Sequence, residues 1–226
     1  MKNKLNWLEA AFVLAPFLIL LAFWDQIPER VPVHWNLNGQ IDRWGSKSAG
    51  MLILPVFSLV TVAVLRFVPW VDPKLGRHLH WADRMGAVLP IVRILFAAFF
   101  LVTFIVVFSA SLGAAVSVGR ILVSTVLLFL AGLGNYLGNL RPNYFVGIRT
   151  PWTLESPETW RATHRLGGKL LFFGSIALLI AEFLIAERIF AVLLMAATLL
   201  YVAWGFVYSW RHFRSSAAAD GTTSST

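Results

Sequence analysis

The chain has 226 residues, of which 58% are hydrophobic and 13% are charged, and its mean hydropathy is +0.72. A soluble domain carries roughly 25% charged residues, so the composition excludes an ordinary soluble protein and indicates a membrane protein. The net charge of +8 could suit nucleic-acid binding, but Lys and Arg lie mainly beside apolar segments and no binding motif occurs. We therefore expect the lipid bilayer as a partner and no nucleic acid.

Six apolar segments are long enough to cross a membrane. At about 1.5 Å per residue each reaches roughly 27–36 Å, against a hydrocarbon core of about 30 Å. The first lacks a small-residue cleavage site, so we expect it to stay as a membrane helix and not to be removed as a signal peptide. The sequence predicts an all-α integral membrane protein with six transmembrane helices, at residues 7–24, 52–70, 87–110, 121–139, 169–186 and 189–210.

The positive charges predict the orientation of these helices. The N-terminus, the second and fourth connections and the C-terminus carry 13 Lys and Arg residues, against 5 in the other connections, with Arg93 left inside a span. Connections rich in Lys and Arg stay in the cytoplasm. Both termini are therefore expected to be cytoplasmic.

The first connection, residues 26–50, would lie outside the cell and predicts a short outer β-hairpin. Val31, Val33 and Trp35 alternate with polar residues, and Asn38-Gly39 is typical of a two-residue type I′ turn. A two-stranded ribbon is only marginally stable by itself. We expect it to rest on the helices.

The fourth connection contains the least generic segment, Arg141-Pro-Asn-Tyr-Phe-Val-Gly-Ile-Arg-Thr-Pro-Trp-Thr-Leu154. Its charges and prolines cannot cross a bilayer, because the backbone would lack hydrogen-bond partners there. Ser156 and Pro157 are typical of a helix start, so we expect an inner interfacial helix that bends at Gly167-Gly168 into the fifth span. We call residues 139–168 the inner motif, because they are predicted to lie on the inner, cytoplasmic side of the membrane.

Ionisable groups inside the spans cost roughly 2.5–3.5 kcal/mol each at mid-membrane, so each needs a reason. Arg66 and Arg93 lie within reach of the cytoplasmic surface and are expected to extend towards it, and Glu9 is similarly close to that surface. Glu182 lies towards the outer end of the fifth span. It either pairs with Arg188 or a helix neighbour, or lines a polar cavity.

Asn135 lies in Gly134-Asn-Tyr-Leu-Gly138, a pattern of small residues that lets helices approach closely. Packing is the expected role of this segment, although a polar role for Asn135 stays open.

Metal binding and catalysis have little support. His78, His80 and Asp83 could ligate a metal, but the two histidines would point apart on a helix, so we expect a solvated interfacial segment and no metal or cofactor. The sequence has no nucleophile elbow, no His-Glu-x-x-His helix and no phosphate-binding glycine loop. His34 could form an acid–base pair with Asp42, and His164 with Glu158, but such pairs occur by chance in any chain of this size. We assign no catalytic residue and expect no enzyme.

Three motifs together resemble a known family. Gly134-Asn-Tyr-Leu-Gly138, the segment from Arg141 to Leu154, and Trp160-Arg-Ala-Thr-His-Arg-Leu-Gly-Gly168 resemble the signature of the SdpI-like immunity proteins, which are multispanning bacterial membrane proteins. The sequence from Ile27 to Lys47 resembles the short N-terminal domain of unknown function that often precedes this signature. The two resemblances cover nearly the whole chain except its tail.

The resemblance implies three parts in a bacterial inner-membrane protein. They are an N-terminal module (residues 1–70), an SdpI-like four-span module (71–214) and a disordered cytoplasmic tail (215–226). It further implies protection of the cell from a secreted membrane-active peptide toxin, in some systems coupled to a cytosolic regulator. The alternative function is a small transporter or lipid-handling protein with Glu182 in a polar path.

Two sets of residues are the candidate sites under this hypothesis. The outer loop would bind the toxin through His34, Trp35, Asn36, Asn38, Asp42 and Trp44. The inner motif, together with Asn135 just before it, would close the inner face or signal inward; its candidate residues are Arg141, Pro142, Asn143, Tyr144, Gly147, Arg149, Thr150, Pro151, Trp152, Trp160, His164 and Arg165.

Overall fold

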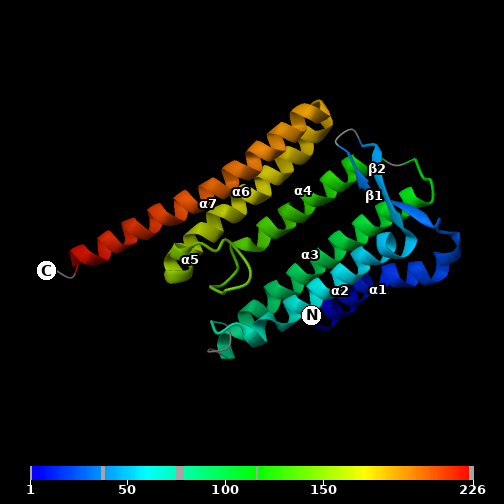
Figure 1. The fold of residues 1–226 in the computed structure, drawn as a ribbon. Helices are drawn as coiled ribbons and strands as arrows, with labels where there is room; N and C mark the ends of the chain where they lie inside the picture. Colours follow the sequence, from blue (N-terminus) through cyan, green and yellow to red (C-terminus); the bar gives the residue numbers. More distant parts are fainter. Residues whose placement is uncertain (1, 37–38, 75–78, 116, 224–226) are drawn as a thin grey trace.

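The structure is a computed structural model that describes residues 2–36, 39–74, 79–115 and 117–223. Long helices lie side by side, and a β-hairpin covers one end of them (Figure 1). The elements are α1 (Lys2–Phe23), a 3-10 turn (Trp24–Gln26), β1 (Arg30–Trp35), β2 (Ile41–Ser46), α2 (Lys47–Val71), α3 (Leu79–Ser111), α4 (Val118–Leu137), α5 (Pro151–Glu155), α6 (Pro157–Leu184) and α7 (Glu187–Thr223).

The six predicted transmembrane helices are confirmed. Within the described residues, α1, α2, α3, α4, α6 and α7 are each long and apolar enough to cross a membrane. The chain is a multi-pass membrane protein of the all-α class with one short hairpin.

The helices are arranged as a row. The central helix α3 packs against α1, α2 and α4, while α4 packs against α6, and α6 against α7. Buried apolar side chains join α1, α2 and α3 along their length, and a cluster around Trp160 adds α4 and α6 at one end. Helix α7 lies at the edge of the row, against α6 and α5.

Glycines bring α4 and α6 into backbone contact. A Cβ on Gly134 would lie 2.6 Å from the backbone nitrogen of Phe172, and a Cβ on Gly168 would lie 2.6 Å from the carbonyl oxygen of Gly134. Any side chain at either glycine would push the two helices apart. The packing role predicted for this segment is confirmed, but it belongs to the glycines, because Asn135 is exposed.

The predicted interfacial helix differs from the observed one. Ser156 caps a helix, as expected, since its hydroxyl accepts from the N–H of Thr159. That helix is α6 itself, which runs through Gly167 and Gly168 without a break because these glycines serve helix contact instead of a bend. The separate short helix is α5, whose start is fixed by a capping box of Thr150 and Thr153.

The hairpin rests on the helices, as predicted. Strand β1 pairs antiparallel with β2, and Val31 is fully buried in a cluster with Met51 and Phe104 from α2 and α3. Beyond the strand ends, the N–H of Asn36 donates to the carbonyl of Gln40 and the N–H of Gly39 donates to the carbonyl of Asn36. The type I′ turn at Asn38-Gly39 stays a prediction. Asn38 lies outside the described residues.

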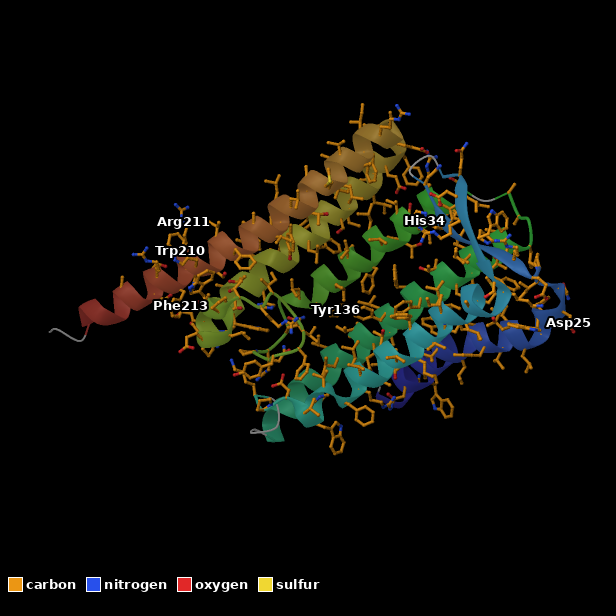
Figure 2. All side chains as sticks on the ribbon, viewed as in Figure 1. Asp25, His34, Tyr136, Trp210, Arg211 and Phe213 are labelled. Atoms are coloured by element: carbon orange, nitrogen blue, oxygen red, sulfur yellow. The ribbon has the colours of Figure 1, made fainter. Side chains whose placement is uncertain are left out.

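The two ends of the row differ in character. The hairpin end carries β1, β2, the α3–α4 connection and the α6–α7 turn, whereas the motif end carries the inner motif and α5, and both termini lie on that side (Figure 1). Figure 2 shows Asp25 and His34 at the hairpin end and Trp210 and Arg211 on α7 towards the motif end. Helix α7 continues to Thr223, which differs from the disordered tail predicted from residue 215.

The orientation of the termini can be tested cleanly because the chain contains no cysteine. Single variants Asp25→Cys at the hairpin end and Ser215→Cys at the motif end should react differently with a membrane-impermeant maleimide in intact cells. We expect Asp25→Cys to be labelled at once and Ser215→Cys only after permeabilisation, because the Lys- and Arg-rich end stays in the cytoplasm. The reverse pattern would contradict the predicted topology.

Candidate functional site

His164 fastens the irregular part of the inner motif to α6. The imidazole is fully buried, its Nδ1 lies 2.9 Å from the carbonyl oxygen of Trp160, and its Nε2 accepts the backbone N–H of Ile148 at 2.9 Å. The carbonyl requires a donor and the N–H requires an acceptor, so the ring is neutral with its proton on Nδ1. Both ring nitrogens therefore hold backbone, and neither is available for proton transfer or for a metal.

Asn143 folds the preceding loop around its side chain. The side-chain oxygen accepts from the N–H groups of Phe145 and Val146 at 2.9 and 2.7 Å. The side-chain nitrogen donates to the carbonyls of Arg141 and Val146 at 2.8 and 3.0 Å. With Asn143 fully buried, one amide satisfies four backbone groups that have no helix or sheet partner.

Trp160 and Thr150 attach this loop to further helices. The indole N–H of Trp160 donates to the carbonyl of Leu140 at 2.9 Å, and the indole stacks on the ring of His164 with centroids 3.9 Å apart. The hydroxyl of Thr150 lies 3.0 Å from that of Ser209 on α7. The inner motif thereby holds α4, α6 and α7 together.

Asp72 and Lys74, which follow α2 in the sequence, also bind the loop of the inner motif. Asp72 is almost fully buried, and its carboxylate accepts the N–H of Tyr144 at 2.8 Å and the N–H of Lys74 at 2.8 Å. The ammonium of Lys74 donates to the carbonyl of Leu154 and lies over the Tyr144 ring. Sequence reasoning missed both roles, because Asp72 and Tyr144 are 72 positions apart.

Other predicted motif residues are more exposed. Arg149 is exposed and donates to the carbonyl of Tyr144 at 2.7 Å, and Arg165 is exposed beside Gly138. Pro151 and Trp152 begin α5. A basic cavity of about 430 Å³ lies at this end, lined by Lys74, Gly138, Asn139, Leu140, Arg141, Pro142, Pro157 and Arg161.

At the hairpin end, Glu182 lines a cavity of about 510 Å³. The walls come from the hairpin loop, the start of α4, the end of α6 and the start of α7, and include Asn36, Arg120, Glu187 and Phe190. Glu182 is buried and accepts the hydroxyl of Ser124 at 2.8 Å. Of the alternatives left open for Glu182, the structure therefore shows a cavity and a helix neighbour.

A second cavity, of about 450 Å³, lies beneath β1. It is mainly apolar, with Trp35 from the hairpin and Leu54, Val107 and Leu122 from the helices among its walls. It shares Asn36, Gly119 and Val123 with the first cavity, so the two adjoin.

The predicted outer-loop residues fall into two groups. Trp35 and Asn36 line the cavities, and His34 lines the second one. His34 Nδ1 lies 2.6 Å from the Asp42 carboxylate across the two strands, in an exposed pair. Trp44 is half-exposed on β2 and lines neither cavity.

A buried ion network joins α1, α2 and α3, and sequence reasoning missed it. The Glu9 carboxylate receives Arg66 Nη1 at 2.9 Å and Arg93 Nε at 2.7 Å. Arg93 and Glu9 are buried, so the expectation that Arg93 extends to the surface is wrong; Arg66 is half-exposed. One feature of the sequence could have indicated this network, because Glu9, Arg66 and Arg93 all lie towards the predicted cytoplasmic ends of their spans.

The acid–base pair of His164 with Glu158 that the sequence offered does not form. His164 binds Trp160 and Ile148, while Glu158 is exposed in the first turn of α6. Among the described residues no group of three His, Cys, Asp or Glu could hold a metal. His78 lies outside the described residues, and the side chains of His80 and Asp83 are not described either.

Comparison with known proteins matches both parts of the chain. Residues 139–209 match the SdpI/YfhL protein family, and residues 11–59 match a domain of unknown function, DUF1648. The segment similar to the SdpI/YfhL family contains the whole inner motif. The chain is also 24% identical over 201 residues to the immunity protein SdpI of Bacillus subtilis (strain 168), covering 88% of this chain and 91% of that protein. No solved structure matches.

The SdpI/YfhL segment depends on glycine at position 147. Gly147 has φ +120°, and an added Cβ would clash with Nε2 of His164. We expect Gly147→Ala to destabilise the fold by about 1–3 kcal/mol, because both the backbone conformation and the His164 contact are lost. Gly174→Ala on α6 is the matched control, since a Cβ there meets no atom within 4 Å. Thermal unfolding in detergent should give a lower melting temperature for Gly147→Ala than for wild type. Equal melting temperatures of these two proteins would contradict the prediction.

Asn143→Asp tests the fourfold hydrogen bonding of the loop. The substitution keeps the shape but replaces two donors by oxygen, which would face the carbonyls of Arg141 and Val146. We expect a loss of about 1–3 kcal/mol, or about 2–4 °C in melting temperature for each kcal/mol. The exposed Asn139→Asp is the control, and a comparable effect from it would show that added charge alone is responsible.

Proposed function

We propose that this protein protects a bacterial cell from a secreted membrane-active peptide toxin, which it binds at the hairpin end from outside the inner membrane. The similarity to the immunity protein SdpI over 88% of the chain carries the proposal. The adjoining cavities at the hairpin end supply a place for such a ligand, because pockets of roughly 300–1,000 Å³ are typical of ligand sites.

The distribution of charge supports an outer hairpin end. Its loops and helix ends carry five acidic and five basic residues, so the +8 of the whole chain arises elsewhere. These ten are Asp25, Glu29, Asp42, Glu182 and Glu187 together with Arg30, Arg43, Lys47, Arg120 and Arg188. An excess of Lys and Arg at the motif end fits a cytoplasmic location for that end.

The inner motif would then act on the cytoplasmic side. Its buried contacts tie α4, α6 and α7 to the end of α2, which suits closure of the inner face. Tyr144 and Phe145 are 43% exposed beside Arg149, which suits contact with lipid headgroups or with a cytosolic regulator. Toxin occupancy would reach a regulator only if the toxin binds two conformations of the bundle unequally.

The alternative function, a small transporter or lipid-handling protein, would use Glu182 in a polar path. The cavity around Glu182 is the observation that favours it. Reconstituted protein would then move a solute, and Glu182→Gln would abolish the flux.

Expression in a toxin-sensitive host tests the immunity proposal. Wild type should raise survival against a membrane-active peptide toxin. Trp35→Ala should reduce the protection, because Trp35 forms a wall of the second cavity. Trp44→Ala, which changes the same residue type outside both cavities, should keep it. Membrane levels of all variants must match, and absence of protection by wild type against every candidate peptide would overturn the proposal.

Arg149→Ala in the same assay separates the two roles of the inner motif. Arg149 is exposed, and its hydrogen bond among the described residues is local, to the Tyr144 carbonyl, so its loss should spare folding. Reduced protection at normal membrane levels would support a signalling role, whereas full protection would show that the motif is structural.

A further inference from the structure

Glu182 is a buried carboxylate without a cation. Within the described part of the chain, no Lys, Arg or His group lies within 4 Å of its carboxylate, which accepts a hydrogen bond from the neutral hydroxyl of Ser124. It is 6% exposed and lies two residues before Leu184, the last residue of α6, where the helix dipole is negative. Both features favour a positive charge beside it.

The cavity does not supply that charge itself. Arg120 is the basic residue among the walls, and it lies 3.8 Å from the Glu187 carboxylate and over the Phe183 ring. Arg120 is thus matched by Glu187, and the carboxylate of Glu182 leaves the cavity with one uncompensated negative charge when ionised. The whole chain has a net charge of +8, whereas the walls of this cavity carry a net negative charge when Glu182 is ionised.

The remaining walls are mainly apolar, with Asn36 and Ser117 as neutral polar residues. The apolar side chains in the lining include Val118, Val123, Phe190, Ala191 and Leu194, and the adjoining second cavity extends the apolar surface beneath the hairpin. A ligand that fills this space must combine one cationic group with flanking apolar groups. A simple metal cation would leave the apolar walls uncovered, and a lipid tail would leave the carboxylate unpaired.

We propose that the Glu182 cavity binds one cationic group of a peptide, a lysine ammonium, an arginine guanidinium or a terminal amine, seated between apolar residues of that peptide. Glu182 is the counter-charge, and Ser124 orients its carboxylate. The inference rests on the proposed function, since the toxin would be the natural ligand, but it concerns the chemistry of one site.

The test uses the full chain in nanodiscs of zwitterionic phosphatidylcholine, which removes attraction to anionic lipid. The probes are two short fluorescent peptides of Leu and Ala with blocked ends. One carries a single central Lys and the other carries norleucine there, which has the same stem without the ammonium. Fluorescence anisotropy, corrected for empty nanodiscs, should show about tenfold tighter binding of the Lys peptide by wild type.

Variants test whether the preference for the Lys peptide depends on Glu182. Glu182→Gln should bring the two affinities together, whereas Glu182→Asp should keep part of the preference because it keeps the charge. Asp25→Asn is the matched control, an equal change of charge at the same end but outside the cavity walls, and it should behave as wild type. Ala191→Trp should weaken both peptides by filling the cavity. Size-exclusion profiles must show that each variant is folded.

Equal binding of the two peptides by wild type would overturn the inference, as would a preference that survives in folded Glu182→Gln. The result is separable from the immunity proposal. Protection in cells with equal peptide binding leaves immunity standing without this site. A Glu182-dependent preference without protection leaves the site standing without immunity.

Discussion

Backbone that leaves a helix beside a membrane must still find hydrogen-bond partners, and this constraint shapes the whole motif end. Residues 139–150 belong to neither a helix nor a strand. Their N–H and carbonyl groups are bonded instead by buried side chains, chiefly Asn143 and His164 from this segment and α6, and Asp72 from the end of α2. Because those side chains come from distant parts of the chain, satisfying the loop also fixes the helices.

The two ends of the protein consequently have different physical characters. At the motif end, buried side chains pair most polar backbone groups of the loop, and apolar side chains pack around Trp160. At the hairpin end, β1 and the hairpin loop line two adjoining cavities, and the buried carboxylate of Glu182 lies in the wall of one of them. The cavity at the motif end is lined by Lys74, Arg141 and Arg161, whereas a cavity at the hairpin end contains Glu182, so the two ends suit ligands of different charge.

The six spans were predictable because apolar length is a local property of sequence, and the surface position of residues 141–154 followed from its charges and prolines. The start of α6 at Ser156 and Pro157 was readable for the same reason. The contacts of Asn143 reach at most three residues, yet their burial depends on remote helices. The links Asp72–Tyr144 and Glu9–Arg93 span 72 and 84 positions, so no local pattern could reveal them.

The sharing of Glu9 by two arginines sets an order for assembly in the membrane. Glu9 is synthesised 57 residues before Arg66 and 84 before Arg93. At about 5–20 residues per second, ribosomes need on the order of 4–17 s to make the longer interval. Glu9 gains its first partner, Arg66, before the end of that interval, and the three-helix ion network is complete only after Arg93 on α3 has been made. Helices α1 and α2, which lie in the predicted N-terminal module, thus share their ion network with a helix that follows that module in the sequence.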